Sequence, residues 1–333
     1  MKKLLVAAAA LSALVGGASA QSNVVLYGEA DAGIGQRYTM DDTGFISNYS
    51  GTSRWGVRGS EDLGNGLKAN FNLESGTIDL GSGSVGGNGS FNRQAWVGVS
   101  GGFGSVMMGR TTTAQNRIMG TFDLNDTADG SSALKYVGLA ANGSFGGSRQ
   151  NSQFQYATPK MGGFEARVSY VFKDDRGGSP NKNFLQVAGR YSGGGLTVGA
   201  AIQSKLSSAP DNRTGYALGA KYDFKSFVIS GLYTQRETKA GGKGFGLGAA
   251  VPFGNFTVGL QAARLTDSAN KAYEDATTFE LFANYKLSKR TRVYAAYGSL
   301  NDEAELLNGS TVNGVRVRSA EDKTFGIGIV HKF

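Results

Sequence analysis

The sequence predicts an all-β transmembrane barrel of sixteen antiparallel strands, and three observations lead to this fold class. Apolar and polar side chains alternate along many short segments, short turns alternate with long polar connections, and no stretch after the N-terminal region is continuously apolar. A tilted strand crosses a bilayer with about 9–11 residues, whereas a helix needs about 20 apolar residues. The chain is therefore expected to cross a membrane with strands and not with helices.

The first twenty residues form a predicted signal peptide. Lys2 and Lys3 precede an apolar stretch at 4–15, and Ala18-Ser19-Ala20 has the pattern of a cleavage site. The apolar stretch is too short to be a membrane anchor, which needs about 20 residues. We therefore expect residues 1–20 to be removed and residues 21–333 to form one barrel domain.

The strands are predicted from side chains that alternate with a period of two. Phe164, Ala166 and Val168 alternate with Glu165 and Arg167. The same pattern occurs at 67–74, 216–223 and 279–286. Such strands have one apolar and one polar face, as in a barrel with lipid outside and a polar interior.

The connections between these strands also alternate in length. Short turns fall near 63–66, 101–104, 159–163, 193–195, 225–226, 254–255 and 288–290. Longer connections fall near 38–51, 78–90, 111–148, 173–183, 205–214, 238–243, 267–276 and 300–320. Together they join sixteen strands, with short turns expected in the periplasm and long loops outside the cell.

A soluble β-sandwich also alternates polar and apolar residues, but it would bury the apolar face. The predicted strands are longer than the usual strand of about 5–6 residues in soluble sheets. Aromatic residues lie near strand ends, at Phe172, Tyr222 and Tyr285, and the chain itself ends in Phe333. Aromatic girdles at both membrane interfaces are typical of outer-membrane barrels, so the pattern favours the barrel.

The amino-acid composition excludes several classes of site and function. The chain has no Cys and one His, which excludes disulfides, thiolate metal sites and multi-histidine relays. We expect no enzyme, because a Ser-His mechanism needs an imidazole beside the nucleophile and His331 lies near the chain end.

The segment 81–86 matches a dinucleotide-binding pattern, but no helical segment follows it. The formal net charge is +8, and the basic residues are spread over strands and loops, so no nucleic-acid binding is predicted. No cofactor is predicted. The acids at 123–130 resemble a calcium-binding loop only weakly because their spacing is wrong, so no metal site is assigned.

Several motifs, in order along the chain, carry a resemblance to the general porins of β-proteobacteria. They lie at 25–28, 54–64, 92–99, 101–104, 109–110, 149–152, 155–156 and 331–333. The resemblance implies a channel in the bacterial outer membrane for small hydrophilic solutes, with the third external loop folded into the lumen. It also implies a homotrimer among lipid and lipopolysaccharide, with Phe333 resembling a signal for the barrel assembly machinery.

The resemblance implies a basic cluster in the constriction, opposite acids of the loop near 111–148. These are Arg54, Arg93 and Arg149 for the basic cluster, and Asp123, Asp126 and Asp129 for the acidic loop. Strand parity independently favours a lumenal Arg54, since a basic residue facing lipid at the midplane costs about 2–4 kcal/mol. We therefore predict a pore that prefers anions.

Alternatives remain open for both the cluster and the protein. The arginines would be ordinary lumen wall if Glu29, Asp31 or Glu74 neutralise them. Arg58 and Arg110 are not assigned to the constriction, and Arg110 is a candidate for fixing the base of the loop. The alternative functions are a substrate-specific anion channel and a surface barrel that serves adhesion.

Overall fold

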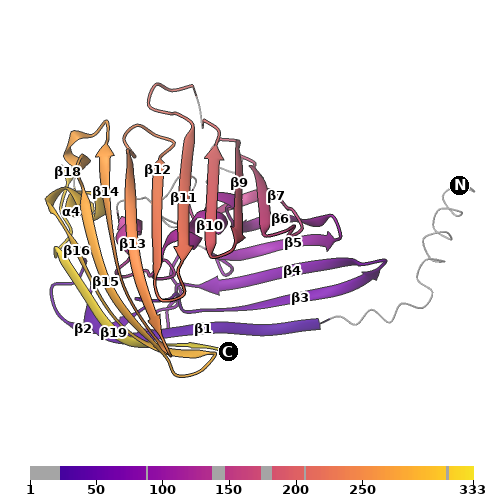
Figure 1. The fold of residues 1–333 in the computed structure, drawn as a ribbon, viewed down its shortest axis with the longest axis horizontal. Coiled ribbons are helices and arrows are strands. Elements are labelled where there is room, and N and C mark those ends of the chain that lie inside the picture. The colour runs from indigo at the N-terminus through magenta and orange to yellow at the C-terminus, as the bar shows by residue number, and fades with distance from the viewer. Residues whose placement is uncertain (1–22, 88, 137–146, 174–181, 206–207, 313–314) are drawn as a thin grey trace, which may run out of the picture.

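The strands form one antiparallel sheet that closes on itself (Figure 1). The computed structural model describes residues 23–87, 89–136, 147–173, 182–205, 208–312 and 315–333, so the predicted signal peptide lies outside the described residues. Within them, sixteen long strands make the wall. They are β1 (Asn23–Gln36), β3 (Arg54–Gly64), β4 (Leu67–Gly76), β5 (Gln94–Gly101), β6 (Gly104–Thr112), β7 (Arg149–Ala157), β8 (Phe164–Val171), β9 (Phe184–Gly193), β10 (Leu196–Gln203), β11 (Gly215–Asp223), β12 (Val228–Gln235), β13 (Lys243–Phe253), β14 (Phe256–Asp267), β15 (Thr277–Lys286), β16 (Thr291–Leu300) and β19 (Lys323–Lys332).

The closure lies where the first strand meets the last. β1 pairs with β3 through Asn23 to Glu29, and with β19 through Glu29 to Gln36. The terminal Phe333 completes the seam, because its backbone N–H donates to Gly28 O and its carbonyl oxygen accepts from Gly28 N–H, both at 3.1 Å. A closed sheet leaves no unpaired backbone groups facing lipid. The predicted sixteen-stranded barrel is confirmed.

The predicted alternation of connections is also present. Tight turns join β3 to β4, β9 to β10 and β13 to β14, and positive φ angles at Asn65, Gly194 and Gly254 let the chain reverse there. Long connections leave the other end of the barrel. We name the connections that the site uses L1 (37–53), L2 (77–93), L3 (113–148) and L8 (301–322). Residues 137–146 of L3 and 313–314 of L8 lie outside the described part.

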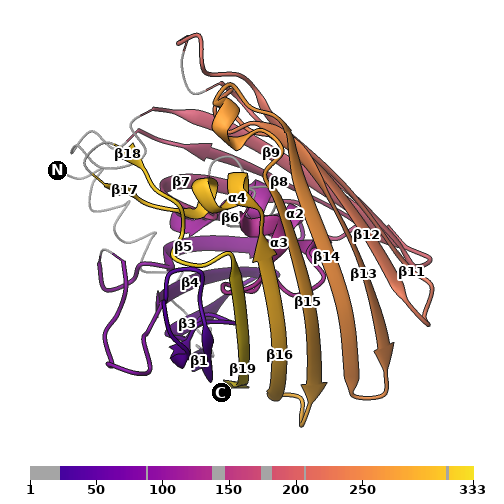
Figure 2. The same cartoon turned by 90° about the vertical axis from the view of Figure 1, so that its left-hand side faces the viewer.

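The shorter elements belong to these connections. L1 carries β2 (Gly44–Ser47), which pairs with β1. L3 carries α2 (Ala114–Met119), η1 (Gly120–Phe122) and α3 (Ala133–Tyr136), and η2 (Lys271–Tyr273) joins β14 to β15. L8 carries α4 (Asp302–Asn308), β17 (Thr311–Val312) and β18 (Val315–Arg316). Figure 2 shows α2 and α3 enclosed by the ring of strands, with α2 against β8–β11 and α3 against β14 and β15.

The two faces of the wall differ as the parity predicts. The apolar row faces outward: Leu218 is 54% exposed, Leu247 59% and Ile327 66%. The inward row is polar, and Gln261 and Glu280 are fully buried beneath L3. This arrangement is the inverse of a sandwich core. No helix in the described ranges is long and apolar enough to span a membrane.

Candidate functional site

L3 is held inside the barrel by apolar contacts with a wall of small residues. Thr113 caps α2 by accepting a hydrogen bond from Asn116 N–H at 3.3 Å. Phe122 is buried at the end of this helical segment, over the glycines of β10 and β11. A Cβ at Gly219 would lie 2.4 Å from its ring, and one at Gly199 would lie 3.0 Å from it. These glycines therefore form a recess that fits one aromatic ring.

Polar contacts fix the rest of L3 to β14 and β15. Leu124 N–H donates to Gln261 Oε1 at 2.8 Å, while Asn125 Nδ2 and Ser131 Oγ both donate to Glu280 Oε1 at 2.7 Å. Gln261 Nε2 bridges Asp123 Oδ1 at 3.1 Å and Glu280 Oε2 at 2.8 Å. Two carboxyl groups thus share one amide on the covered face of the loop.

Asp123 therefore does not lie where the sequence prediction placed it. It is 5% exposed, and it accepts hydrogen bonds from Ser132 and Gln261 on the wall side of L3. Burial raises the pKa of this carboxyl above its ordinary value, although the hydrogen bonds from Ser132 and Gln261 oppose the shift. The prediction of three lumenal acids differs from the structure here, because Asp123 anchors the loop.

The other side of L3 borders a cavity of about 1030 Å³ in the lumen. The wall strands contribute Arg54 and Arg149 to its lining, the end of L2 contributes Arg93, and L3 contributes Asp126 and Asp129. The structure thus brings five of the six predicted site residues to one cavity. Seven basic and four acidic side chains line it, so its lining carries an excess of positive charge.

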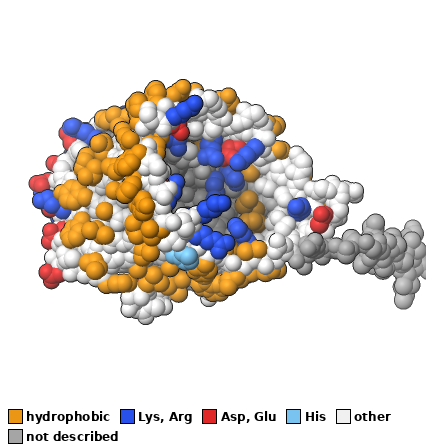
Figure 3. All heavy atoms as spheres, turned by 60° about the horizontal axis from the view of Figure 1, so that its bottom comes forward, with side chains coloured by type: hydrophobic (Ala, Val, Ile, Leu, Met, Phe, Trp, Pro, Cys, Tyr) orange, Lys and Arg blue, Asp and Glu red, His pale blue; other side chains and the backbone are white. Residues whose placement is uncertain are grey.

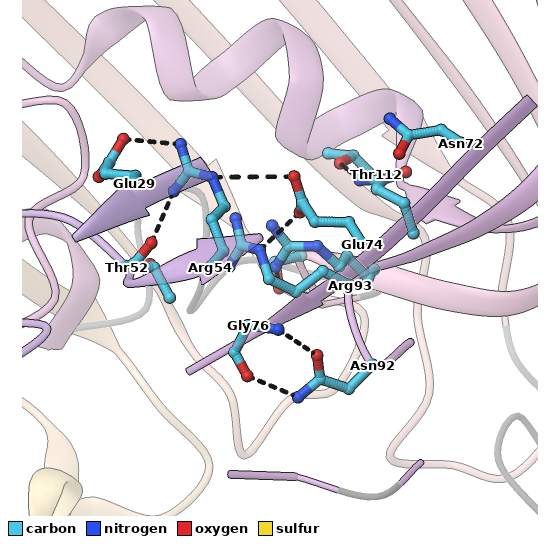
Figure 4. A network of polar contacts seen from close by, with 12 residues as sticks. Glu29, Thr52, Arg54, Asn72, Glu74, Gly76, Asn92, Arg93 and Thr112 are labelled. Atoms are coloured by element: carbon cyan, nitrogen blue, oxygen red, sulfur yellow. Dashed lines mark hydrogen bonds and ion pairs between the residues drawn. The ribbon is translucent and has the colours of Figure 1, made fainter. Parts of the chain in front are cut away.

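Arg54 and Arg93 are held by two glutamates of the wall, as Figure 4 shows. Arg54 Nη2 lies 2.8 Å from Glu29 Oε2, and its Nε lies 3.7 Å from Glu74 Oε2. Arg93 Nε lies 2.7 Å from Glu74 Oε1. The glutamates fix both guanidinium groups in place and offset part of their charge.

Arg149 differs from the other two arginines. Its Nη1 lies 3.5 Å from Ser148 Oγ, and its Nε is buried without a hydrogen-bond partner among the described residues. No described carboxylate forms an ion pair with it. Arg93, Arg110 and Arg54 are its cationic electrostatic neighbours. A guanidinium in such surroundings has donors left for an anion.

Of the two lumenal acids, Asp129 is held by side-chain contacts with both L3 and L1. Asp129 Oδ1 lies 3.2 Å from Lys135 Nζ, and Asp129 Oδ2 accepts from Thr52 Oγ1 of L1 at 2.7 Å. Gly130 N–H donates to Tyr49 O of L1 at 2.7 Å. Asp126 has φ +53°, within the turn that follows Phe122. L1 thus supports the tip of L3.

Sequence reasoning missed two arginines of the same cavity, Arg37 and Arg292. Arg37 donates to Ser47 O and Asn48 O, both at 2.6 Å, and Arg292 donates to Ser50 Oγ at 2.7 Å. Arg292 shares the inward parity of Tyr294, a signal that could have identified it. Arg37 follows β1 inside L1, where strand parity gives no direction.

The remaining candidates lie elsewhere. Arg110 donates to Asn92 O at 2.6 Å and to Asn151 Oδ1 at 2.7 Å, which links the end of L2 to β7. Arg58 stacks over the ring of Tyr27, with its Cζ 4.9 Å from the centroid. The segment 81–86 lies in L2, and the described residues between it and β5 contain no helix.

Phe333 lies on the outward side of the seam. Its ring occupies the space above Gly28, where a Cβ would lie 2.2 Å from Phe333 Cζ. The ring is half exposed toward the lipid side, in the same outward row as His331. The ring contact therefore depends on a glycine at position 28.

Several known proteins that resemble this chain in sequence or in structure are porins. Residues 7–305 match the family described as Gram-negative porin. Outer membrane porin protein 32 of Delftia acidovorans is 33% identical over 362 residues, covering all of both chains. An outer membrane porin protein of Bordetella pertussis is 30% identical over 403 residues with the same coverage. The solved anion-selective porin from Comamonas acidovorans is 29% identical, with a TM-score of 0.74, covering 94% of this chain and 100% of that one.

A closed sixteen-stranded barrel with a charged lumen and an inserted third loop defines a diffusion channel of the outer membrane. The chain belongs to the Gram-negative porin family. It is an outer-membrane porin, a channel and not an enzyme, as the sequence predicted.

Proposed function

We propose that this porin is a general diffusion channel for small hydrophilic solutes and that it prefers anions. The filter consists of Arg54, Arg93 and Arg149, facing Asp126 and Asp129 across the cavity. The observation that carries the proposal is the charge of the lining, with seven basic against four acidic side chains. Among these three arginines, Arg149 is the one without an ion pair to a described carboxylate.

The position of these charges matters more than the net charge of the chain. At physiological ionic strength, electrostatic interactions are screened over about 8 Å, so charges at the constriction dominate selectivity. Basic side chains on one side and acids on the other create a transverse field in the narrowest part. The similarity to a solved porin described as anion-selective supports the same preference.

The test is the reversal potential of the folded protein in a planar bilayer across a tenfold KCl gradient. We expect a reversal on the anion side, which shifts toward zero in R149Q. A cation-sided reversal would contradict the proposed preference and give the filter to Asp126 and Asp129. Conductance that saturates with one anion would favour a substrate-specific channel, and absent conductance would favour an adhesion barrel.

Three further proposals complete the functional description. Residues 1–20 are a cleaved signal peptide, and 21–333 form the mature barrel. The protein assembles as a homotrimer among lipid and lipopolysaccharide. The barrel assembly machinery recognises the strand that ends in Phe333. The family resemblance supports these assignments, and mass spectrometry of the mature N-terminus together with the mass of the unboiled protein tests the first two.

A further inference from the structure

L3 borders a second, open cavity of about 370 Å³ beside the constriction. It is lined by both ends of the loop, by α2 and by the turn around Asp126. Asn116, Asp126, Thr127 and Arg149 line both cavities, so the two adjoin. A solute that passes Arg149 therefore meets this second space without crossing the wall.

Two arginines line this cavity, and neither is neutralised by a described ion pair. Arg117 lies in the last turn of α2 with its side chain exposed to the lumen. Glu74 and Glu165 are its electrostatic neighbours, but neither is ion-paired with it. Arg149 contributes the second guanidinium, with its buried Nε unpartnered in the described part of the chain. Both groups thus retain donors for a solute.

Two hydroxyl groups add neutral donors. Thr112 Oγ1 accepts from Gln94 Nε2 at 3.1 Å, and Thr121 Oγ1 accepts from Arg190 Nη1. Each hydroxyl can accept and also donate one hydrogen bond. Because the accepting role is in use, the O–H proton of each remains to donate to a solute. Guanidinium and hydroxyl donors together suit the oxygen atoms of a carboxylate or a phosphate.

Asp126 is the one carboxylate in the described lining of this cavity. Two guanidinium groups and one carboxylate leave a single positive charge. Permeation requires a site that attracts a solute and still releases it. Asp126 therefore weakens retention of an anion, and its removal should strengthen it.

A basic surface continues from this cavity along the inner face of β8, β9 and β11. Arg167 has its Nε buried and unpartnered among the described residues, and Arg117 and Arg190 are its cationic electrostatic neighbours. Arg190 pairs with Glu165 at 3.0 Å, and Lys221 Nζ donates to Thr121 O at 2.9 Å. Figure 3 shows basic side chains gathered inside the hollow of the barrel. An anion leaving the cavity thus meets further positive charge.

We propose that the cavity between Arg117 and Arg149 is a second anion-binding position, which takes small oxyanions of the carboxylate and phosphate type. The inference rests on the proposed anion preference and adds a site on L3 itself. An anion held by the Arg54, Arg93 and Arg149 filter moves to Arg117 as it leaves Arg149, and Asp126 promotes its release.

The test is block of the single-channel chloride current by inorganic phosphate at pH 7, in wild type, R117Q and D126N. Loss of one charge-assisted contact should raise the half-blocking phosphate concentration by roughly tenfold or more. We expect that increase in R117Q and a decrease in D126N. R117K, which keeps the charge, should lie between R117Q and wild type.

R58Q is the matched control, because Arg58 is outside the lining of this cavity and its loss removes the same charge from the chain. Its half-blocking concentration should equal that of wild type. Equal effects of R117Q and R58Q, or an unchanged D126N, would overturn the second site. A cation-sided reversal of wild type would instead overturn the proposed function. Mobility of the unboiled protein on a gel verifies that each variant is folded.

Discussion

Two parts of the wall follow the same strand parity yet differ in their inner surfaces. Where L3 covers the wall, on β10, β11 and β13 to β15, the inward residues beneath it include glycines such as Gly219 and Gly246 and the amide of Gln261, which hydrogen-bonds the loop. From β3 to β7 the wall is open to the cavity, and it presents Arg54, Glu74 and Arg149. Parity alone therefore separates lipid from lumen, and residue size separates the covered from the open lumen wall.

The difference has an energetic cause. A loop buried in a barrel must satisfy its polar groups and fill its contacts without voids. Small residues of the covered wall let Phe122 and Leu134 approach the backbone closely, and Gln261 and Glu280 satisfy loop donors. The open wall faces solvent, so charged side chains are tolerated there without full pairing.

The largest effect is expected from filling the recess for Phe122. The Cβ of G219A would lie 2.4 Å from the Phe122 ring, and overpacking of this kind costs about 1–3 kcal/mol. That cost favours an undocked L3, so the variant should show a larger and noisier single-channel conductance with weaker selectivity.

The control for G219A is G231A on the neighbouring strand β12. A Cβ at Gly231 would meet only the end of the Leu247 side chain, at 3.3 Å, on the outer face of the barrel. Its conductance should equal that of wild type. If G219A also conducts as wild type does, the recess does not hold the loop, and the contrast between the two walls loses its physical basis.

The next effect concerns the seam where the covered and open parts of the wall are joined. Deleting Phe333 removes two backbone hydrogen bonds of 3.1 Å to Gly28 and the ring above it. Because the residue is remote from the lumen, we expect the folded yield in the outer membrane to fall while the conductance of the folded fraction is unchanged.

A conservative variant, F333Y, keeps the ring and the backbone pairing. It should restore the yield that the deletion loses. Surface levels of the deletion variant equal to wild type would contradict an assembly role for Phe333, and altered conductance in its folded fraction would place the residue in the pore.

The fold could be predicted from the sequence because a strand that crosses a bilayer needs a limited length and one apolar face. Alternation at residues 164–172 and the turns near 63–66 and 254–255 are local features, and the barrel needs them at fixed intervals. The outward rows and the closure by the last strand followed from the same pattern.

The site could be predicted only in part. The family motifs implied Arg54, Arg93 and Arg149 together, and strand parity independently favoured the lumenal direction of Arg54. Asp123 and Asp126 lie three residues apart on an irregular loop, and only the docked conformation separates them into a covered and a lumenal acid. A loop has no fixed side-chain period, so its contacts with β14 and β15 decide which face each acid occupies.

The smallest effect is a pH dependence of loop docking that originates on the covered wall. The pKa of Asp123 is raised above its ordinary value of 3.8, chiefly by burial, and Glu280 is the carboxyl that faces it across Gln261. A raised carboxyl pKa means that the docked loop is most stable at low pH and loses stability as pH rises from that ordinary value through the raised one. D123N, which cannot ionise, should therefore recover stability at higher pH relative to wild type.

The measurement for Asp123 is the thermal transition of the folded protein, followed by circular dichroism from pH 4 to 9. The transition temperature should fall with pH in wild type and change less in D123N, because the amide cannot ionise on the covered wall. D129N, which removes an acid from the lumenal face of the same loop, should keep the wild-type slope. Parallel slopes in wild type and D123N would show that the covered acid does not control docking.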